Sequence, residues 1–225
     1  MKGYNMNIAV FDTETTSLQK PYCYNIGIVG YNTDTDEILF KQEYVIEQIW
    51  YNLELFNTAY YAEKRELYVK SLRSRQSKLD KFGYVMQAIK RLFKAFDIQS
   101  VYAYNSPFDE RVLSFNCDWF KVINPFEHLP LFDIRGYVFN KIAFTESYKD
   151  WCEIHQQFTE SANYSTTAEA IYRFIVQDIE FIEDHTALSD SLIELDILKY
   201  CIEKGAKWDT EYKVYQSVPD RYKKL

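Results

Sequence analysis

Two carboxylates, Asp12 and Glu14, directly follow an apolar run at residues 8–11. Such a run is typical of a short buried strand, on which residues two apart point the same way, about 6.6 Å apart along the chain. Both side chains then project from one face at the strand's end, where a stiff backbone can hold them as ligands of a divalent metal. The pattern alone is weak, because other acid–x–acid pairs occur at Asp34/Asp36, Asp178/Glu180, Glu194/Asp196 and Asp209/Glu211. The position directly after a buried strand, which does not favour acids, sets Asp12 and Glu14 apart.

Three further residues could contribute to chemistry with these acids. Asp109 falls in the first turn of an expected helix, where an acid is also explained by the helix dipole. His185 and Asp190 lie at the start of a later helix, where a surface or packing histidine and a solvated acid are the ordinary explanations. The two residues are five apart, about 140° around an ideal helix, so we expect His185 at or before the helix start.

The elements that must position these residues follow from apolar periodicity. The pattern predicts strands at residues 8–12, 24–31, 37–46 and 100–104, and helices at 79–96 and 184–204. Residues 47–78 are irregular in pattern, and we expect a basic, helical insertion there. Three strands followed by helix, strand and helix predict a mixed sheet flanked by helices. In such folds the functional sites gather at strand ends.

The charge distribution singles out one segment of the chain. The net charge is −7, yet residues 64–94 carry ten basic residues against two acids. This asymmetry points to a polyanionic partner, and we expect the surface that binds it to include Lys70, Arg73 and Arg75. A solvated helix face explains the same charges equally well.

Composition limits the class of protein and its compartment. Hydrophobic residues make up 47% of the 225 residues, which is enough for a buried core. No run approaches the length of about 20 apolar residues that crosses a bilayer, and no signal peptide is visible. The four cysteines are widely spaced without a C-x-x-C motif, which fits reduced thiols. We therefore expect a cytoplasmic protein that does not associate with membranes.

Taken in order, the candidate residues fall within three motifs. These are Phe11-Asp12-Thr13-Glu14-Thr15-Thr16, Asn105-x-x-Phe108-Asp109 and His185-Thr186-Ala187-Leu188-Ser189-Asp190. The set resembles the DEDDh 3′–5′ exonucleases, the family of the epsilon proofreading subunit, RNase T and oligoribonuclease. The resemblance covers about residues 7–204, apart from the insertion. Ser17 departs from the glycine common in the family, and Thr186 stands where the sister class has tyrosine, so the histidine class is the match.

The resemblance implies a fold, a metal site and substrate contacts. The fold is α/β, an RNase H-like mixed five-stranded sheet flanked by helices, in a single exonuclease domain over residues 1–225. Two Mg²⁺ ions, with Mn²⁺ able to substitute, have as implied ligands Asp12, Glu14, Asp109 and Asp190. His185 would accept the proton of the attacking water. The implied substrate contacts are Thr15, Leu18, Asn105 and Phe108, of which Leu18 resembles the residue that wedges against the terminal base.

The expected function is therefore a metal-dependent 3′–5′ exonuclease. It would release nucleoside 5′-monophosphates from single-stranded DNA or RNA ends, and any polymerase that it served in proofreading would be a separate chain. The alternative is a catalytically idle module on the same fold that binds strand ends or acts as an adaptor. The presence of all five reacting residues favours the enzyme.

Overall fold

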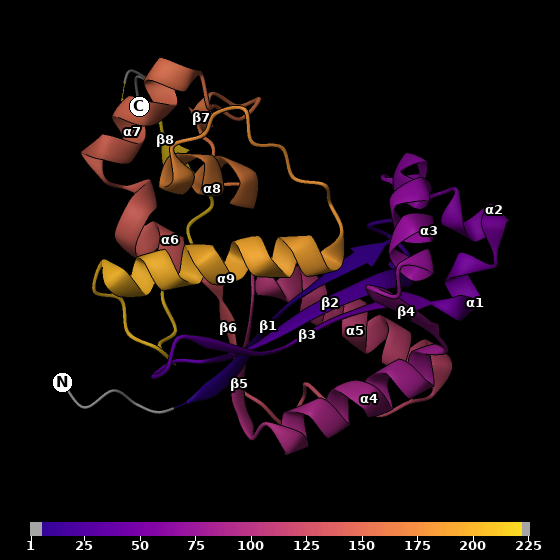
Figure 1. Cartoon of the computed structure of the whole chain (residues 1–225). Coiled ribbons are helices and arrows are strands. Elements are labelled where there is room, and N and C mark those ends of the chain that lie inside the picture. The colour runs from indigo at the N-terminus through magenta and orange to yellow at the C-terminus, as the bar shows by residue number, and fades with distance from the viewer. Residues whose placement is uncertain (1–5, 222–225) are drawn as a thin grey trace.

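A six-stranded sheet in the order β4-β3-β2-β1-β5-β6 forms the centre of the computed structural model, which describes residues 6–221 (Figure 1). The strands are β1 Asn7–Thr15, β2 Cys23–Asn32, β3 Glu37–Ile46, β4 Ser77–Asp80, β5 Ile98–Ala103 and β6 Leu131–Asp133. The first three form an antiparallel meander, whereas β4 runs parallel to β3, β5 to β1 and β6 to β5. The α/β class and the mixed sheet are confirmed, and the sheet has six strands rather than five.

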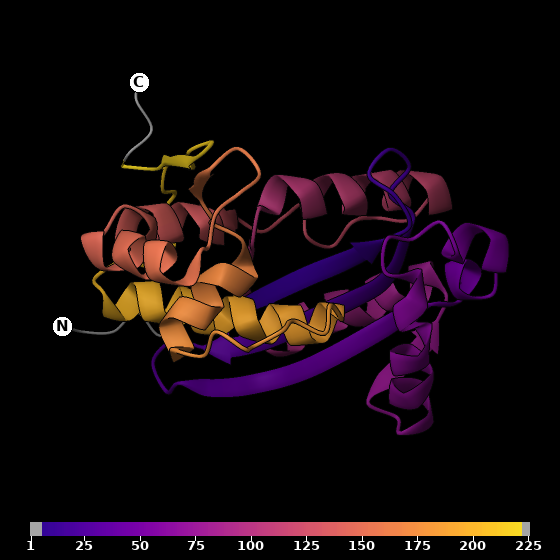
Figure 2. The ribbon, with the colours of Figure 1, turned by 90° about the horizontal axis from the view of Figure 1, so that it is seen from above.

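Helices cover both faces of the sheet (Figures 1 and 2). Because side chains alternate along β1, Phe11 packs with one set of helices and Val10 with the other. The Phe11 face carries α4 (Phe82–Ala95) and α5 (Ser106–Phe120). The Val10 face carries α6 Ile134–Val138, the π-helical turn η2 Phe139–Ala143, α7 Glu146–His155, α8 Ala168–Val176 and α9 Ala187–Glu203. A small sheet pairs β7 (Asn163–Tyr164) with β8 (Val218–Pro219).

Residues 47–76 form a helical unit at the C-terminal end of β1 (Figure 1). Its elements are α1 Glu47–Trp50, α2 Leu53–Phe56, the 3₁₀ turn η1 Ala62–Lys64 and α3 Arg65–Arg73. The chain then enters β4, so the expectation that a helix starts at residue 79 is wrong. A four-residue strand is too short to show its own periodicity, and it merged with the pattern of the helix that follows.

The last long helix, α9, begins at Ala187, so His185 lies just before it, as expected. Residues 181–186 have no regular secondary structure. No helix in residues 6–221 is long and apolar enough to span a bilayer.

Candidate active site

Asp12 and Glu14 continue the face of β1 that carries Ile8 and Val10. Ile8 and Val10 are fully buried beneath the helices of that face. The two acids emerge at the edge where β1 and β5 both end, because these strands run parallel. The Tyr24 hydroxyl donates a long hydrogen bond of 3.4 Å to Glu14. Because side chains alternate along β1, the face that is apolar in the middle of the strand becomes acidic at its end.

Asp190 reaches the same place from the first turn of α9. The helix start lies directly against β2 at Gly27, and the Ala187 N–H donates to the Asn25 side chain at 2.9 Å. Ligand oxygens of Asp12, Glu14 and Asp190 lie within 4.8 Å of one another. The Oδ1 atom of Asp190 is buried and has no hydrogen-bond partner among the described residues.

Asp109 approaches from the opposite face of β1, on the first turn of α5. Its Oδ1 accepts hydrogen bonds from the Thr13 N–H at 3.1 Å and from the Thr13 hydroxyl at 2.6 Å. Burial raises the pKa of Asp109, and the charge of Asp12 raises it further. The structure therefore places Asp109 beside Asp12, outside the group of three acids whose ligand oxygens lie within 4.8 Å.

The carboxylates are crowded in a buried setting. Burial raises the pKa of Asp12, Glu14 and Asp190, and the charge of Asp12 raises the pKa of the other two further. Acids packed this closely cannot all ionise without a counter-charge. A divalent cation supplies that charge, and Mg²⁺ prefers such oxygen donors. The donor set and the unpartnered Asp190 oxygen therefore fit a hard divalent metal.

His185 lies beside this cluster with its backbone in the left-handed region, at a φ of 52°. Its Nδ1 is 3.6 Å from Oε2 of Glu183, and its ring stacks on Tyr61 with 4.3 Å between centroids. Ligand atoms of Glu183, His185 and Asp190 also lie within 4.8 Å of one another. Burial lowers the pKa of His185, and Lys64 lowers it further, so the imidazole is neutral at neutral pH.

The sequence interpretation missed two acids of the site, Glu183 and Glu194. Burial raises the pKa of Glu183 to about 7, with the charge of Glu169 next in effect. Glu194 is 4% exposed and accepts a hydrogen bond from the Tyr104 N–H at 3.2 Å. Its pKa is raised by burial first, and then by Asp12 and the other acids. Glu194 lies four residues after Asp190, on the same helix face, so helical spacing from Asp190 was the signal available.

The expected substrate contacts lie in different settings around the cluster. Thr15 is half-buried at the end of β1, and Leu18 is 72% exposed on the loop that follows. The Asn105 side chain is exposed and accepts a hydrogen bond from Arg135 at 3.1 Å. Phe108 packs partly against the core, with the Arg111 guanidinium 5.4 Å from its ring centroid. Leu18 and Asn105 are thus the more accessible of the four.

Lys70, Arg73 and Arg75 of the insertion are solvent-exposed. Lys70 lines a groove of about 520 Å³ that also includes Asp184 and Thr186, the neighbours of His185 in sequence. Arg73 and Arg75 are exposed at the end of α3 and on the turn beyond it. Of these three residues only Lys70 lines this groove, while Lys64 of the insertion donates directly to the Asp184 carbonyl at 3.0 Å.

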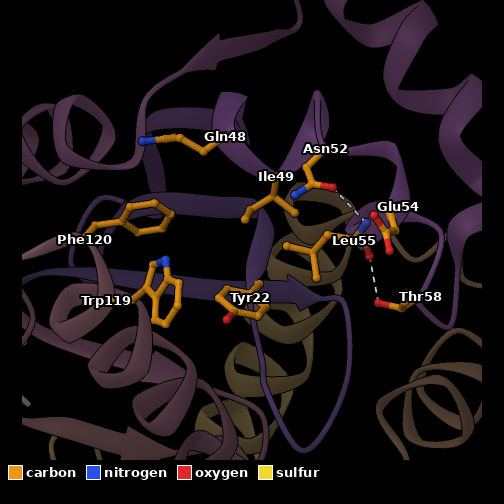
Figure 3. Close-up of a pocket in the computed structure, with 9 residues that line it drawn as sticks. All are labelled: Tyr22, Gln48, Ile49, Asn52, Glu54, Leu55, Thr58, Trp119 and Phe120. Carbon is orange, nitrogen blue, oxygen red and sulfur yellow. Dashed lines mark hydrogen bonds between the residues drawn. The ribbon is translucent and has the colours of Figure 1, made fainter.

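An open aromatic groove lies between the insertion and the end of α5 (Figure 3). Its volume is about 470 Å³, and Tyr22, Trp119 and Phe120 face Ile49 and Leu55 across it. The carboxylates do not line it, although Tyr22 belongs to the loop that leaves β1. The groove is thus a feature next to the acidic site and not part of it.

Comparison with solved structures identifies the fold of the chain. No family model and no curated protein sequence matches the chain. The nuclease domain of 3′hExo, a DEDDh family member bound to rAMP, aligns at a TM-score of 0.57 and 15% identity over 97% of this chain and 100% of that one. The 3′-exonuclease solved in the recognition of the histone mRNA stem-loop gives 0.59 and 14%, over 97% and 75%. E. coli Exonuclease I with a dA16 oligonucleotide gives 0.51 and 11%, over 87% and 41%. The chain therefore has the fold of the DEDDh exonucleases.

Proposed function

We propose that this protein is a metal-dependent 3′–5′ exonuclease that hydrolyses single-stranded nucleic-acid ends to nucleoside 5′-monophosphates. The observation that carries the proposal is the convergence of Asp12, Glu14 and Asp190 within 4.8 Å, with His185 beside Asp190. Similar structures that hold rAMP or a dA16 oligonucleotide support a nucleic-acid substrate.

The acids divide into two ligand groups for two divalent ions. Asp12, Glu14 and Asp190 would hold one ion, and Asp12 with Asp109 would hold the other. Once bound, the metal pair activates water and neutralises the charge that develops on the phosphate. Mg²⁺ fits the oxygen donors, and Mn²⁺ would substitute because carboxylates suit both ions.

His185 is the proposed general base. Its Nδ1 faces Glu183 at 3.6 Å, which leaves Nε2 to accept the proton of the attacking water. The lowered pKa of His185 keeps the ring neutral and able to accept that proton near neutral pH. Leu18, exposed on the loop after β1, would contact the terminal base.

The alternative is a catalytically idle binding module. It is disfavoured because burying several acids close together lowers the stability of the folded protein. Asp109 and Glu194 are 2% and 4% exposed, and both have raised pKa values. Buried acids without a counter-charge destabilise a fold. A module that only bound strand ends would gain nothing from this cost, whereas a metal enzyme would use Asp109 as a ligand and would offset the buried charge with the bound cation.

Labelled single strands test this proposal directly. Single-stranded DNA and RNA carrying a 5′ label are incubated with the protein and Mg²⁺, with chelator, and with a blocked 3′ end. The proposal predicts a ladder that shortens by single nucleotides, and no ladder with chelator or with the blocked end. A labelled mononucleotide as the first product would indicate the opposite polarity, and intact strands in Mg²⁺ and in Mn²⁺ would refute the enzyme.

A further inference from the structure

The segment that carries His185 has few hydrogen bonds of its own: the Thr186 N–H and hydroxyl donate to Asp184 Oδ1 at 3.1 and 3.0 Å. Residues 181–186 have no helix or strand, and His185 adopts a φ of 52°, a region that residues with a Cβ rarely occupy. Such a conformation persists only where neighbouring groups over-determine it. On one side, α8 supplies part of that support, since the Glu183 N–H donates to Glu169 at 3.2 Å and Arg173 donates to the Phe181 carbonyl at 2.7 Å.

On the other side, the insertion supplies three contacts to His185 and its neighbour. The Tyr61 ring lies nearly parallel to the imidazole, at 13° and 4.3 Å between centroids. The Tyr68 hydroxyl donates to the His185 carbonyl at 3.3 Å, and Lys64 Nζ donates to the Asp184 carbonyl at 3.0 Å. Lys64 also lies 4.7 Å from the centre of the Tyr61 ring. The insertion therefore contacts both the ring of His185 and the backbone of the segment that carries it.

The insertion is itself fixed to the sheet. Tyr68 is fully buried and packs edge-on against Tyr24 of β2, with 5.8 Å between centroids. Within the insertion, the Arg65 guanidinium lies 3.7 Å from the centre of the Trp50 ring and donates to the Trp50 carbonyl at 3.0 Å. Tyr24 in turn donates to Glu14. The contacts that reach His185 thus start from a rigid base that also touches the acidic cluster.

We propose that residues 61–68 of the insertion act as a clamp that positions His185, with Tyr61 as the residue that fixes the plane of its ring. The inference rests on the proposed function, because it assigns a role in that reaction. Tyr61 is a positioning residue: it acts through His185 and does not contact the reacting atoms. A proton acceptor works only when it is held in line with the water, so losing the stack lowers the rate of the chemical step.

Kinetics of five variants, one of them His185→Ala alone, test the clamp. Tyr61→Ala should lower kcat on the order of 10–10²-fold while KM stays unchanged, because misplacing a catalytic group costs about this much. Tyr61→Phe keeps the stacked ring and should retain the wild-type rate. The matched control is Tyr51→Ala, since Tyr51 belongs to the same insertion and is 66% exposed; it should leave the rate unchanged. In a His185→Ala background, Tyr61→Ala should add no further loss, because the group it positions is gone.

Three kinetic results would overturn the clamp. Wild-type kcat in Tyr61→Ala would show that the stack is idle. A raised KM with unchanged kcat would make Tyr61 a substrate contact. An equal loss from Tyr61→Ala with and without His185 would show that it acts through another group.

An NMR measurement tests the clamp without relying on activity. The chain has three histidines, so deletion of one signal in His185→Ala assigns the His185 ring. Its proton signals should carry an upfield ring-current shift that is lost in Tyr61→Ala and kept in Tyr61→Phe. An unchanged signal in Tyr61→Ala would refute the clamp. If wild-type protein cleaves nothing while the shift behaves as expected, the proposed function fails and the positioning contact stands.

Discussion

The Cβ atom that Gly27 lacks would lie 2.0 Å from the carbonyl carbon of Ala187, so strand β2 and the start of α9 touch backbone to backbone. Asp190 lies one turn further along the same helix. The absence of a side chain at Gly27 therefore sets how close Asp190 comes to Asp12 and Glu14.

Replacement of Gly27 by alanine should separate α9 from the sheet. The new methyl group meets backbone atoms, which cannot rotate away, so overpacking should cost about 1–3 kcal/mol or more in unfolding free energy. Cleavage should fall with it, because Asp190 moves relative to Asp12. Gly83→Ala is the control, since a Cβ there meets only the Val122 side chain, at 3.2 Å. Denaturant unfolding and cleavage assays on both variants check this. A Gly27→Ala variant with the stability and the cleavage rate of the wild type would contradict the account.

Neutralising one acid should affect stability and activity in opposite directions. Asp12→Asn removes a charge that raises the pKa of Glu14, Asp109 and Asp190. Relief of that repulsion, on the order of 1 kcal/mol, should raise the melting temperature of the metal-free protein by about 2–4 °C. Cleavage and stabilisation by Mg²⁺ should both be lost. Thermal melts with Mg²⁺ and with chelator measure this, and a variant that melts lower without metal would argue against stored repulsion.

The metal-free protein should lose stability as the pH rises. The folded-state pKa values of the clustered acids are raised, so the folded state binds more protons than the unfolded state and its stability declines as those protons leave. The decline should run from the ordinary carboxylate range near 4 to at least about 7, the pKa of Glu183. Mg²⁺ should flatten the slope. Chelator melts across this pH range measure it, and stability that rises with pH would contradict the raised pKa values.

His185→Ala should lose on the order of 10²–10⁴ in cleavage rate, as expected for removal of a general base. Stabilisation by Mg²⁺ should persist, because the carboxylates remain. Since the folded-state pKa of His185 is lowered from 6.5, wild-type activity should fall only below pH 6.5, as the imidazole gains a proton. A rate and a pH profile unchanged by His185→Ala would leave the residue a structural role only.

The basic surface of the insertion should bind the strand upstream of its end. A combined replacement by serine of the exposed residues Lys70, Arg73, Arg75 and Lys78 should weaken binding of long strands. Each lost phosphate contact should reduce the salt slope by about 0.7. Cleavage of a dinucleotide should barely change, because it is too short to reach this surface.

The matched control removes the same number of exposed charges from helix α4 and the residue before it, at Lys81, Lys90, Arg91 and Lys94. This set lies along α4, outside the insertion, and should leave the salt slope unchanged. If the two quadruple variants bind long strands alike, residues 70–78 are only a solvated surface. Strand affinity would then come from stacking on exposed aromatics such as Trp119.

Local patterns in the sequence predicted much of the fold and the centre of the site. The apolar run before Asp12 predicted β1, and the spacing of His185 and Asp190 predicted a histidine just before α9. Both depend on periodicity within one element. Strand β4 was missed because pairing with β3, and not its own four residues, makes it a strand.

The remainder of the site depends on contacts between distant segments. Glu194 is buried by its place beside Asp190 on α9, although its local sequence matches that of exposed acids. The close approach of Gly27 to Ala187 and the stacking of Tyr61 on His185 join residues more than one hundred positions apart. The residue pattern within one segment cannot predict contacts with a distant segment, so these contacts could be identified only from the structure.

The most direct test of the central claim follows the oxygen of the attacking water. Single-stranded DNA and RNA are digested with Mg²⁺ in water enriched in heavy oxygen, by the wild type and by Asp12→Asn, and the released mononucleotides are analysed by mass spectrometry. The account predicts nucleoside 5′-monophosphates with one heavy oxygen in the phosphate from the wild type, and none from the variant. Release of 3′-monophosphates, equal release by Asp12→Asn, or no release from any strand would contradict it.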